Sequence, residues 1–77
     1  MLVLIAGGGR TGAHLATLLL AQGHEVRVIE SRKEVLARLH RQLPTETIYE
    51  GSPTDPQLLV QVGIDRVDVV AAVTGMD

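Results

Sequence analysis

The chain has 77 residues, 45% of them hydrophobic, and Tyr49 is its only aromatic residue, so it has the size of one domain with an aliphatic core. Its formal charge is −2 and its acidic and basic residues are interspersed, which argues against nucleic acid as a partner and against a polybasic contact with a membrane surface. The lack of cysteine excludes disulfides, thiolate catalysis and cysteine-based metal sites.

The chain starts with the apolar run Leu2–Ala6, which predicts a buried strand. Together with Met1 this run is too short for a signal peptide and lacks the positive flank that one requires. No apolar run reaches the roughly 20 residues of a membrane helix. We therefore expect a cytoplasmic protein without direct membrane insertion.

Apolar, β-branched runs alternate with amphipathic helical patterns along the whole chain. The predicted strands are Leu2–Ala6, Glu25–Glu30, 45–50 and 67–73. The predicted helices are 11–22, 32–42 and 56–62. This alternation predicts a βαβαβαβ order and hence an α/β fold with a parallel sheet.

Residues typical of turns and helix caps lie at the ends of these predicted elements. Gly23 and Gly63 stand where a residue with positive φ would end a helix. Residues 31–34 have the pattern of a capping box, and Asp55 before Pro56 is typical of an N-cap followed by proline in the first turn. In helix 32–42, the predicted buried residues are Val35, Leu36 and Leu39, and the predicted solvated ones are Arg32, Lys33, Arg38 and Arg41.

A glycine-rich turn joins the first strand to the first helix. Its sequence is Gly7-Gly8-Gly9-Arg10-Thr11-Gly12, the G-x-G-x-x-G pattern in the strand–turn–helix context that makes it specific. Gly7 would permit the tight turn, Gly9 would let a pyrophosphate approach the backbone, and Gly12 would let helix and strand pack closely. The positive end of the helix dipole would face the phosphates.

Glu30 ends the second strand, eighteen residues after Gly12. An acid at this place accepts hydrogen bonds from the adenosine ribose hydroxyls and repels a 2′-phosphate, which favours NAD(H) over NADP(H). Arg32 and Lys33 follow directly and could instead accept a 2′-phosphate. As a purely structural alternative, the glycines would only form a tight turn and Glu30 would be a solvated strand end.

Right-handed crossovers and the dinucleotide-fold topology predict the strand order 3-2-1-4. The first two helices would then cover one face of the sheet and helix 56–62 the other. The ligand crevice would lie between strands one and four, where the glycine turn meets Thr74 and Gly75. Folds of this class continue beyond the fourth strand, so residues 1–77 are predicted to be the N-terminal half of a Rossmann-type domain.

Several segments together resemble the TrkA-N (RCK or KTN) domain, the nucleotide-binding regulatory domain of bacterial potassium channels and transporters. They are Gly7–Gly12, Val28-Ile29-Glu30-Ser31-Arg32, Tyr49-Glu50-Gly51-Ser52, Leu58-Leu59-Val60-Gln61-Val62-Gly63-Ile64 and Asp68-Val69-Val70-Ala71-Ala72-Val73-Thr74. The resemblance covers essentially the whole chain. It implies a cytoplasmic homodimer or higher assembly that acts on a potassium channel or transporter subunit.

The resemblance also implies a ligand and its contacts. NAD(H) is the first candidate ligand, and ATP or ADP is the second. The implied phosphate contacts are Gly7, Gly9, Arg10 and Thr11. Glu30 would contact the adenosine ribose, Arg32 the adenine or ribose side, and Thr74 the nicotinamide half. The implied site also includes Gly8, Gly12, Ser31, Gly51 and Ser52, with Ser52 on the adenine side. The family usually has aspartate where this chain has Glu30 and Ser52.

The other polar residues suggest no catalytic site. Histidines 14, 24 and 40 lack metal-ligand spacing, and Asp65 and Asp68 are interpreted as a loop acid and a strand-entry acid. The leading hypothesis is a non-enzymatic regulatory binding module. The alternatives are the cofactor half of an NAD-dependent oxidoreductase and a self-associating fragment without a working site.

Overall fold

The computed structural model describes residues 1–73. The strands are β1 Leu2–Ala6, β2 Glu25–Glu30, β3 Ile48–Glu50 and β4 Val69–Ala72. The helices are α1 Arg10–Ala21, α2 Lys33–Gln42 and α3 Pro56–Gln61, and two short 3-10 helices are η1 Thr45–Thr47 and η2 Ile64–Arg66. The predicted alternation of strands and helices is confirmed.

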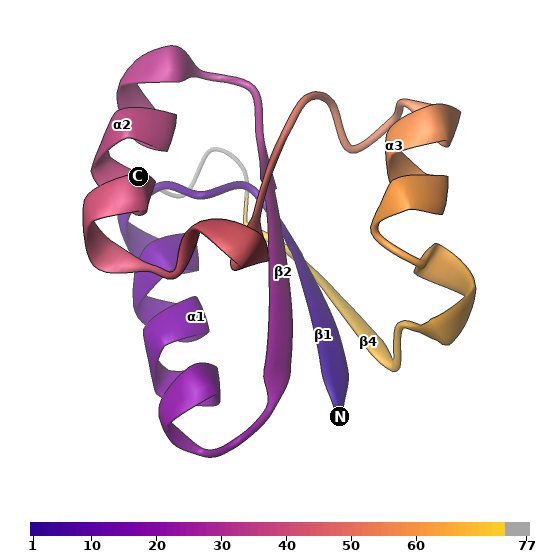
Figure 1. Ribbon diagram of the computed structural model, residues 1–77, viewed down its shortest axis with the longest axis horizontal. Coiled ribbons are helices and arrows are strands. Elements are labelled where there is room, and N and C mark those ends of the chain that lie inside the picture. Colours follow the sequence, from indigo (N-terminus) through magenta and orange to yellow (C-terminus); the bar gives the residue numbers. More distant parts are fainter. Residues whose placement is uncertain (74–77) are drawn as a thin grey trace.

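The four strands form one parallel sheet in the order β3-β2-β1-β4, as predicted (Figure 1). In the central pair Ile5 lies opposite Val28, and on the other side of β1 it lies opposite Ala71. Glu30 and Glu50, the last residues of β2 and β3, are also paired. The carboxyl ends of these strands therefore lie at one edge of the sheet.

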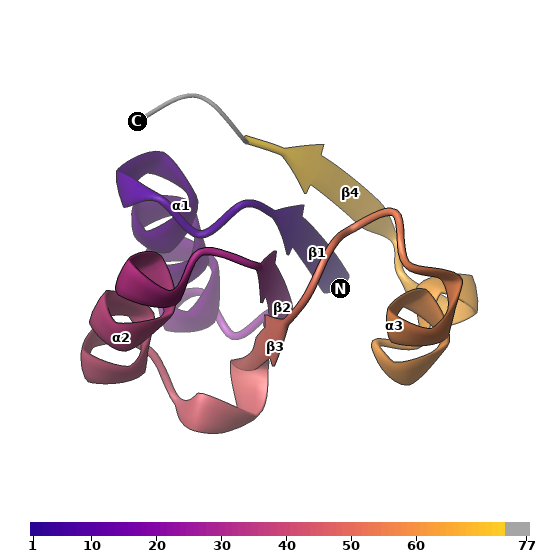
Figure 2. The same cartoon turned by 90° about the horizontal axis from the view of Figure 1, so that it is seen from above.

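Helices cover both faces of the sheet. Helices α1 and α2 pack on one face and α3 on the other, as predicted (Figures 1 and 2). The larger core cluster joins strands β1 and β2 to α1 and α2, and the smaller one joins them to Leu58 of α3 and to Val62, which follows α3. Because β1 is covered on both faces, all of its residues are buried.

The predicted strand 45–50 is wrong in its first half. Residues 45–47 form η1, in which both the backbone N–H and the hydroxyl of Thr47 donate to the Pro44 carbonyl, at 3.0 and 2.7 Å. A β-branched threonine favours a strand, but its hydroxyl here bonds the backbone locally and stabilises a turn. Strand β3 is accordingly only three residues long.

The predicted strand 67–73 is too long at both ends. The Val67 N–H still donates to Ile64 in the preceding turn, 3.3 Å away. Asp68 then bonds both backbone groups of Leu2: its N–H donates to the Leu2 carbonyl, and its Oδ2 accepts the Leu2 N–H, each at 2.8 Å. Asp68 is thus the strand-entry acid predicted from the sequence, and it fixes the start of the β1–β4 pair.

Helix ends agree with the predicted caps in three cases and disagree in one. Gly23 and Gly63 have φ values of 89° and 72°, and Asp55 Oδ1 accepts the Gln57 N–H at 3.0 Å. The capping box at residues 31–34 is wrong, because α2 begins at Lys33 with Arg32 as its N-cap and no side-chain cap bond. Helix α1 begins at Arg10 and ends at Ala21, one residue earlier than predicted at each end.

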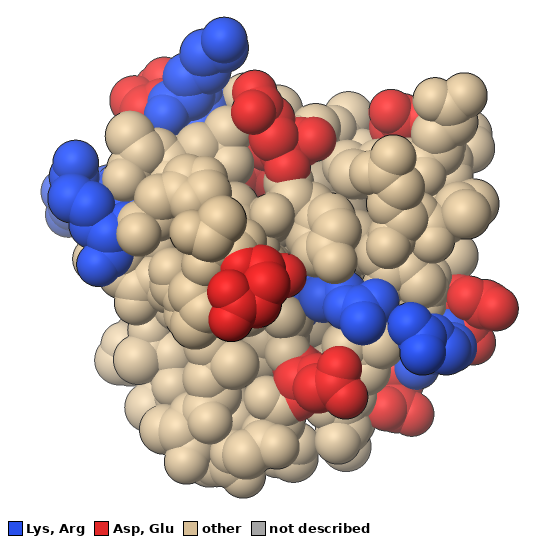
Figure 3. Space-filling view, viewed as in Figure 1, with Lys and Arg blue, Asp and Glu red and all other residues tan. Residues whose placement is uncertain are grey.

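Side-chain charges are mixed on the surface. Figure 3 shows acidic and basic side chains interspersed on the face seen in Figure 1. Within residues 1–73, which the structure describes, no helix is both long enough and apolar enough to cross a bilayer.

Candidate nucleotide-binding site

The glycine turn leaves β1 at the carboxyl edge of the sheet. Gly7 has a φ of 112°, a conformation that other residues rarely adopt, and its N–H donates to the Ile29 carbonyl at 2.9 Å. A Cβ at Gly12 would lie 2.1 Å from the Gly7 carbonyl oxygen and 3.1 Å from Val73 Cγ2. Glycine at position 12 therefore lets α1 approach both the turn and the end of the fourth strand.

Gly8 has a packing role that the sequence did not reveal. It is buried, and a Cβ at this position would lie 2.4 Å from Leu39 Cδ1 and 3.3 Å from Val28 Cγ1. Its N–H donates to Glu30 Oε1 at 2.7 Å. The middle of the turn is thus held by α2 and by β2, and the Gly8 N–H points to a protein acceptor.

Helix α1 presents its N-terminus next to this turn. The N-cap residue is Gly9, which has no side chain to cap the helix, and the first turn contains no acidic residue. The exposed side chains of Arg10 and Thr11 follow at once. Since a 12-residue helix carries a partial positive charge at this end, the turn is suited to an anion.

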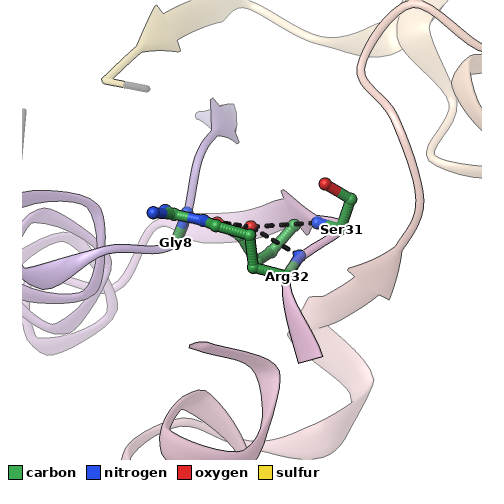
Figure 4. A network of polar contacts seen from close by, with 4 residues as sticks. Gly8, Ser31 and Arg32 are labelled. Atoms are coloured by element: carbon green, nitrogen blue, oxygen red, sulfur yellow. Dashed lines mark hydrogen bonds and ion pairs between the residues drawn. The ribbon is translucent and has the colours of Figure 1, made fainter. Parts of the chain in front are cut away.

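Glu30 is buried rather than solvated, with 4% of its surface exposed. Its Oε1 accepts from Gly8 N, and its Oε2 accepts from the backbone N–H groups of Ser31 and Arg32 at 3.0 and 2.9 Å. The Arg32 guanidinium bonds both oxygens, with Nε 3.0 Å from Oε2 and Nη2 3.2 Å from Oε1 (Figure 4). The structural alternative of a solvated strand end is therefore wrong.

The bonds to Glu30 control its ionisation. Burial alone raises the pKa of Glu30, but hydrogen bonds from the Arg32 side chain, from the backbone N–H of Arg32 and from Gly8, together with the positive charge of Arg32, lower it to about 2. The carboxylate is thus ionised at neutral pH. This carboxylate also accounts for the missing capping box, because it accepts the hydrogen bonds of the Ser31 and Arg32 backbone N–H groups that precede α2.

The remaining predicted residues follow the neighbouring strand ends. The Gly51 N–H donates to the Glu30 carbonyl at 2.9 Å, and a Cβ at Gly51 would lie 2.7 Å from Leu58 Cδ2. The Ser52 hydroxyl is exposed and lies 2.7 Å from the hydroxyl of Thr54. The Ser31 side chain is exposed, and Thr74 lies outside the described residues.

A groove of about 660 Å³ lies outside this cluster, between α1 and α2. It is lined by Arg10, Ala13, His14, Thr17, Arg38 and Gln42. Of the predicted site residues it includes only Arg10. The prediction that Arg38 is a solvated residue is wrong, because the side chain is partly buried and its Nε has no hydrogen-bond partner among the described residues.

The structure brings together residues from three strand ends: the glycine turn after β1, Glu30 to Arg32 after β2, and Gly51 and Ser52 after β3. The contacts that the sequence missed are the packing of Gly8 against Leu39 and the pairing of Arg32 with Glu30. The sequence did contain a signal for the pairing of Arg32 with Glu30, since the arginine stands two residues after the acid that ends β2.

The parallel order 3-2-1-4 and the glycine turn between β1 and α1 define a Rossmann-like domain. Residues 3–77 match the TrkA-N domain family, whose members are nucleotide-binding domains. The chain belongs to this family.

Individual relatives agree with the family assignment. The chain is 40% identical over its whole length to a Trk system potassium uptake protein TrkA homolog of Methanothermobacter thermautotrophicus and 36% identical to one of Pyrococcus abyssi. It covers 35% and 34% of those two proteins. A Trk system potassium uptake protein TrkA of Vibrio alginolyticus is 36% identical over 75 residues, which is 97% of this chain and 16% of that protein. The chain thus spans about a third of the archaeal relatives and less of the bacterial one.

Proposed function

We propose that this chain is the nucleotide-binding regulatory module of a potassium uptake system. Its ligand is NAD(H) or an adenine nucleotide, ATP or ADP, and it carries out no chemistry on that ligand. The observation that carries the proposal is the convergence of the glycine turn, the α1 N-terminus and the buried Glu30 at one edge of the sheet. Membership of the TrkA-N family and the names of the relatives support the link to potassium uptake.

The contacts that we propose for the complex combine this geometry with the roles that the family resemblance implies. The phosphates lie at Gly7, Gly9, Arg10 and Thr11, where the helix dipole and a guanidinium favour negative charge. The adenosine ribose lies at Glu30, and Gly51 and Ser52 flank the adenine side. Thr74 contacts the nicotinamide half. The module acts on the cytoplasmic side of the membrane, in contact with a channel or transporter subunit.

Gly9→Val tests the position of the phosphates. Gly9 has φ −67° and ψ −166°, an extended conformation that is also open to valine, so the substitution does not require a change of the backbone. We expect NADH, NAD, ATP and ADP to bind roughly tenfold or more weakly to this variant, because the branched side chain occupies the place of the pyrophosphate. Isothermal titration calorimetry gives the affinities.

Ala21→Val is the matched control, since Ala21 is exposed at the far end of the same helix. It should bind each nucleotide as the parent does. Circular dichroism establishes that both variants are folded. A folded Gly9→Val protein with parental affinity would place the site elsewhere, and a parent that binds none of the nucleotides would refute the proposed function.

A further inference from the structure

The Arg32 side chain is hydrogen-bonded to Glu30, the acid that is proposed to bind the ribose. Its guanidinium forms a two-bond fork on Glu30, with Nε on Oε2 at 3.0 Å and Nη2 on Oε1 at 3.2 Å. The two partners differ in exposure, since 43% of the Arg32 side chain and 4% of the Glu30 side chain are accessible. Arg32 is therefore the more exposed partner of a buried carboxylate, and Figure 4 shows the polar contacts of this cluster.

The hydrogen-bonding capacity of Glu30 is already filled. A carboxylate has about four lone-pair positions, and Glu30 accepts from the backbone N–H groups of Gly8, Ser31 and Arg32 in addition to the guanidinium fork. The backbone donors are fixed by the glycine turn and by the start of α2. The Arg32 side chain can leave by rotation about its own bonds, without any change of the backbone.

We propose that Arg32 sets the choice between a free ribose diol and a ribose 2′-phosphate. A diol reaches the Glu30 oxygens only after it displaces the guanidinium, so Arg32 competes with it. A 2′-phosphate needs a cation instead of an acceptor, and the displaced guanidinium supplies one. The inference rests on the proposed function, because it places the ribose at Glu30.

Arg32→Ala separates these two effects by their sign. In the variant we expect the affinity ratio of ATP to 2′,3′-dideoxy-ATP to rise about threefold to tenfold, because only the ligand with hydroxyls gains acceptors on Glu30. The affinity ratio of NADPH to NADH should fall by a similar factor. Titration calorimetry with these four ligands measures both ratios. The ratio of ATP to dideoxy-ATP cancels the general effect of the lost charge, because the two ligands carry the same phosphates. The ratio of NADPH to NADH does not cancel it, because NADPH carries one more phosphate, and therefore needs a control for charge.

Arg41→Ala is the control for charge, because Arg41 is an exposed cation in the last turn of the same helix. Both ratios should stay at their parental values in this variant. If Arg32→Ala does not fold, Arg32→Gln gives the same comparison, since glutamine removes the charge and the fork but keeps a polar side chain.

The outcomes distinguish the two proposals. A parent that binds these nucleotides, combined with unchanged ratios in the Arg32 variants, overturns the role of Arg32 alone. A fall in the ATP to dideoxy-ATP ratio also overturns it, because Arg32 would then assist the diol. A parent that binds none of the four ligands refutes the proposed function, and the inference fails with it.

Discussion

Glu30 connects three parts of the chain through one side chain. It accepts from the glycine turn at Gly8, from its own strand end at Ser31, and from the residue before α2, Arg32. The extra methylene of glutamate, compared with aspartate, lengthens its reach toward the Gly8 N–H. At the scale of single residues, this carboxylate is as much a structural anchor of the turn as a candidate ligand contact.

The stability of the fold should depend on the ionisation of Glu30. Its pKa is about 2 in the folded protein and 4.5 as the ordinary value, so the unfolded chain binds the proton more readily. The stabilisation is therefore complete above the ordinary value and is lost as the pH falls from about 4.5 toward 2. Its full size is on the order of 3 kcal/mol. Urea unfolding between pH 2 and 6 measures it.

Glu30→Gln provides the comparison, because glutamine has a similar shape and does not titrate. The difference in free energy of unfolding between parent and variant should shrink as the pH falls through this window. A difference that is constant over the whole range would show that Glu30 has an ordinary pKa.

At the scale of elements, α3 is short, yet with the following Val62 it packs against the strands on the face of the sheet opposite α1 and α2. Its start is fixed by the Asp55 cap and by Pro56, and Leu58 and Val62 carry its buried surface. Asp55→Ala should lower the free energy of unfolding by about 1 kcal/mol, since the Gln57 N–H loses its acceptor. Chemical denaturation measures this loss.

Asp65→Ala is the matched control, because Asp65 is an exposed acid in η2, a 3-10 helix without a side-chain cap bond. It should leave stability within about 0.5 kcal/mol of the parent. Equal losses in the two variants would show that the Asp55 cap contributes nothing specific.

The order and type of elements could be predicted from the sequence, whereas several boundaries could not. Alternating apolar patterns and right-handed crossovers leave few topologies, so the order 3-2-1-4 followed directly. The starts of β3 and β4 depend on local bonds: Thr47 bonds the Pro44 carbonyl, and Asp68 bonds Leu2. A partner 66 residues away in the chain leaves no signal in local periodicity.

The same distinction applies to the candidate site. Its members could be located because each follows the carboxyl end of a parallel strand. Their contacts were not predicted, for two different reasons. Gly8 packs against Leu39 of α2, a contact that arises only once α2 lies on the sheet. The pairing of Glu30 with Arg32 is local, but the sequence alone does not show that Glu30 turns inward toward Arg32 rather than outward to solvent.

At the scale of the whole molecule, β4 is an edge strand of the described sheet. Val69 and Val70 are 45% and 56% exposed, although both are apolar. Asp68 does not protect this edge, because its carboxylate is bonded to the Leu2 N–H of β1. An exposed apolar edge strand can pair with a strand of another chain, which is consistent with the homodimer or higher assembly that the family resemblance implies.

We expect light scattering on the 77-residue chain to give at least twice the mass of one 8.3 kDa chain. Val70→Lys should shift the chain toward the monomer, because a lysine on the edge strand opposes pairing. Leu18→Lys is the control, since Leu18 is similarly exposed on α1, far from β4. A parent that remains monomeric at all concentrations, with β4 protected from amide exchange, would contradict the assembly.

The hydrogen bonds that Glu30 forms within the chain have a consequence for the range of ligand concentrations over which the proposed site would respond. A ligand that binds at this acid exchanges existing hydrogen bonds for new ones, so part of its interaction free energy is spent on releasing Arg32. Intrinsic contacts can then be numerous and specific while net affinity stays modest. Occupancy consequently follows a falling nucleotide concentration instead of remaining saturated, and the number of contacts in such a site is a poor guide to its working range.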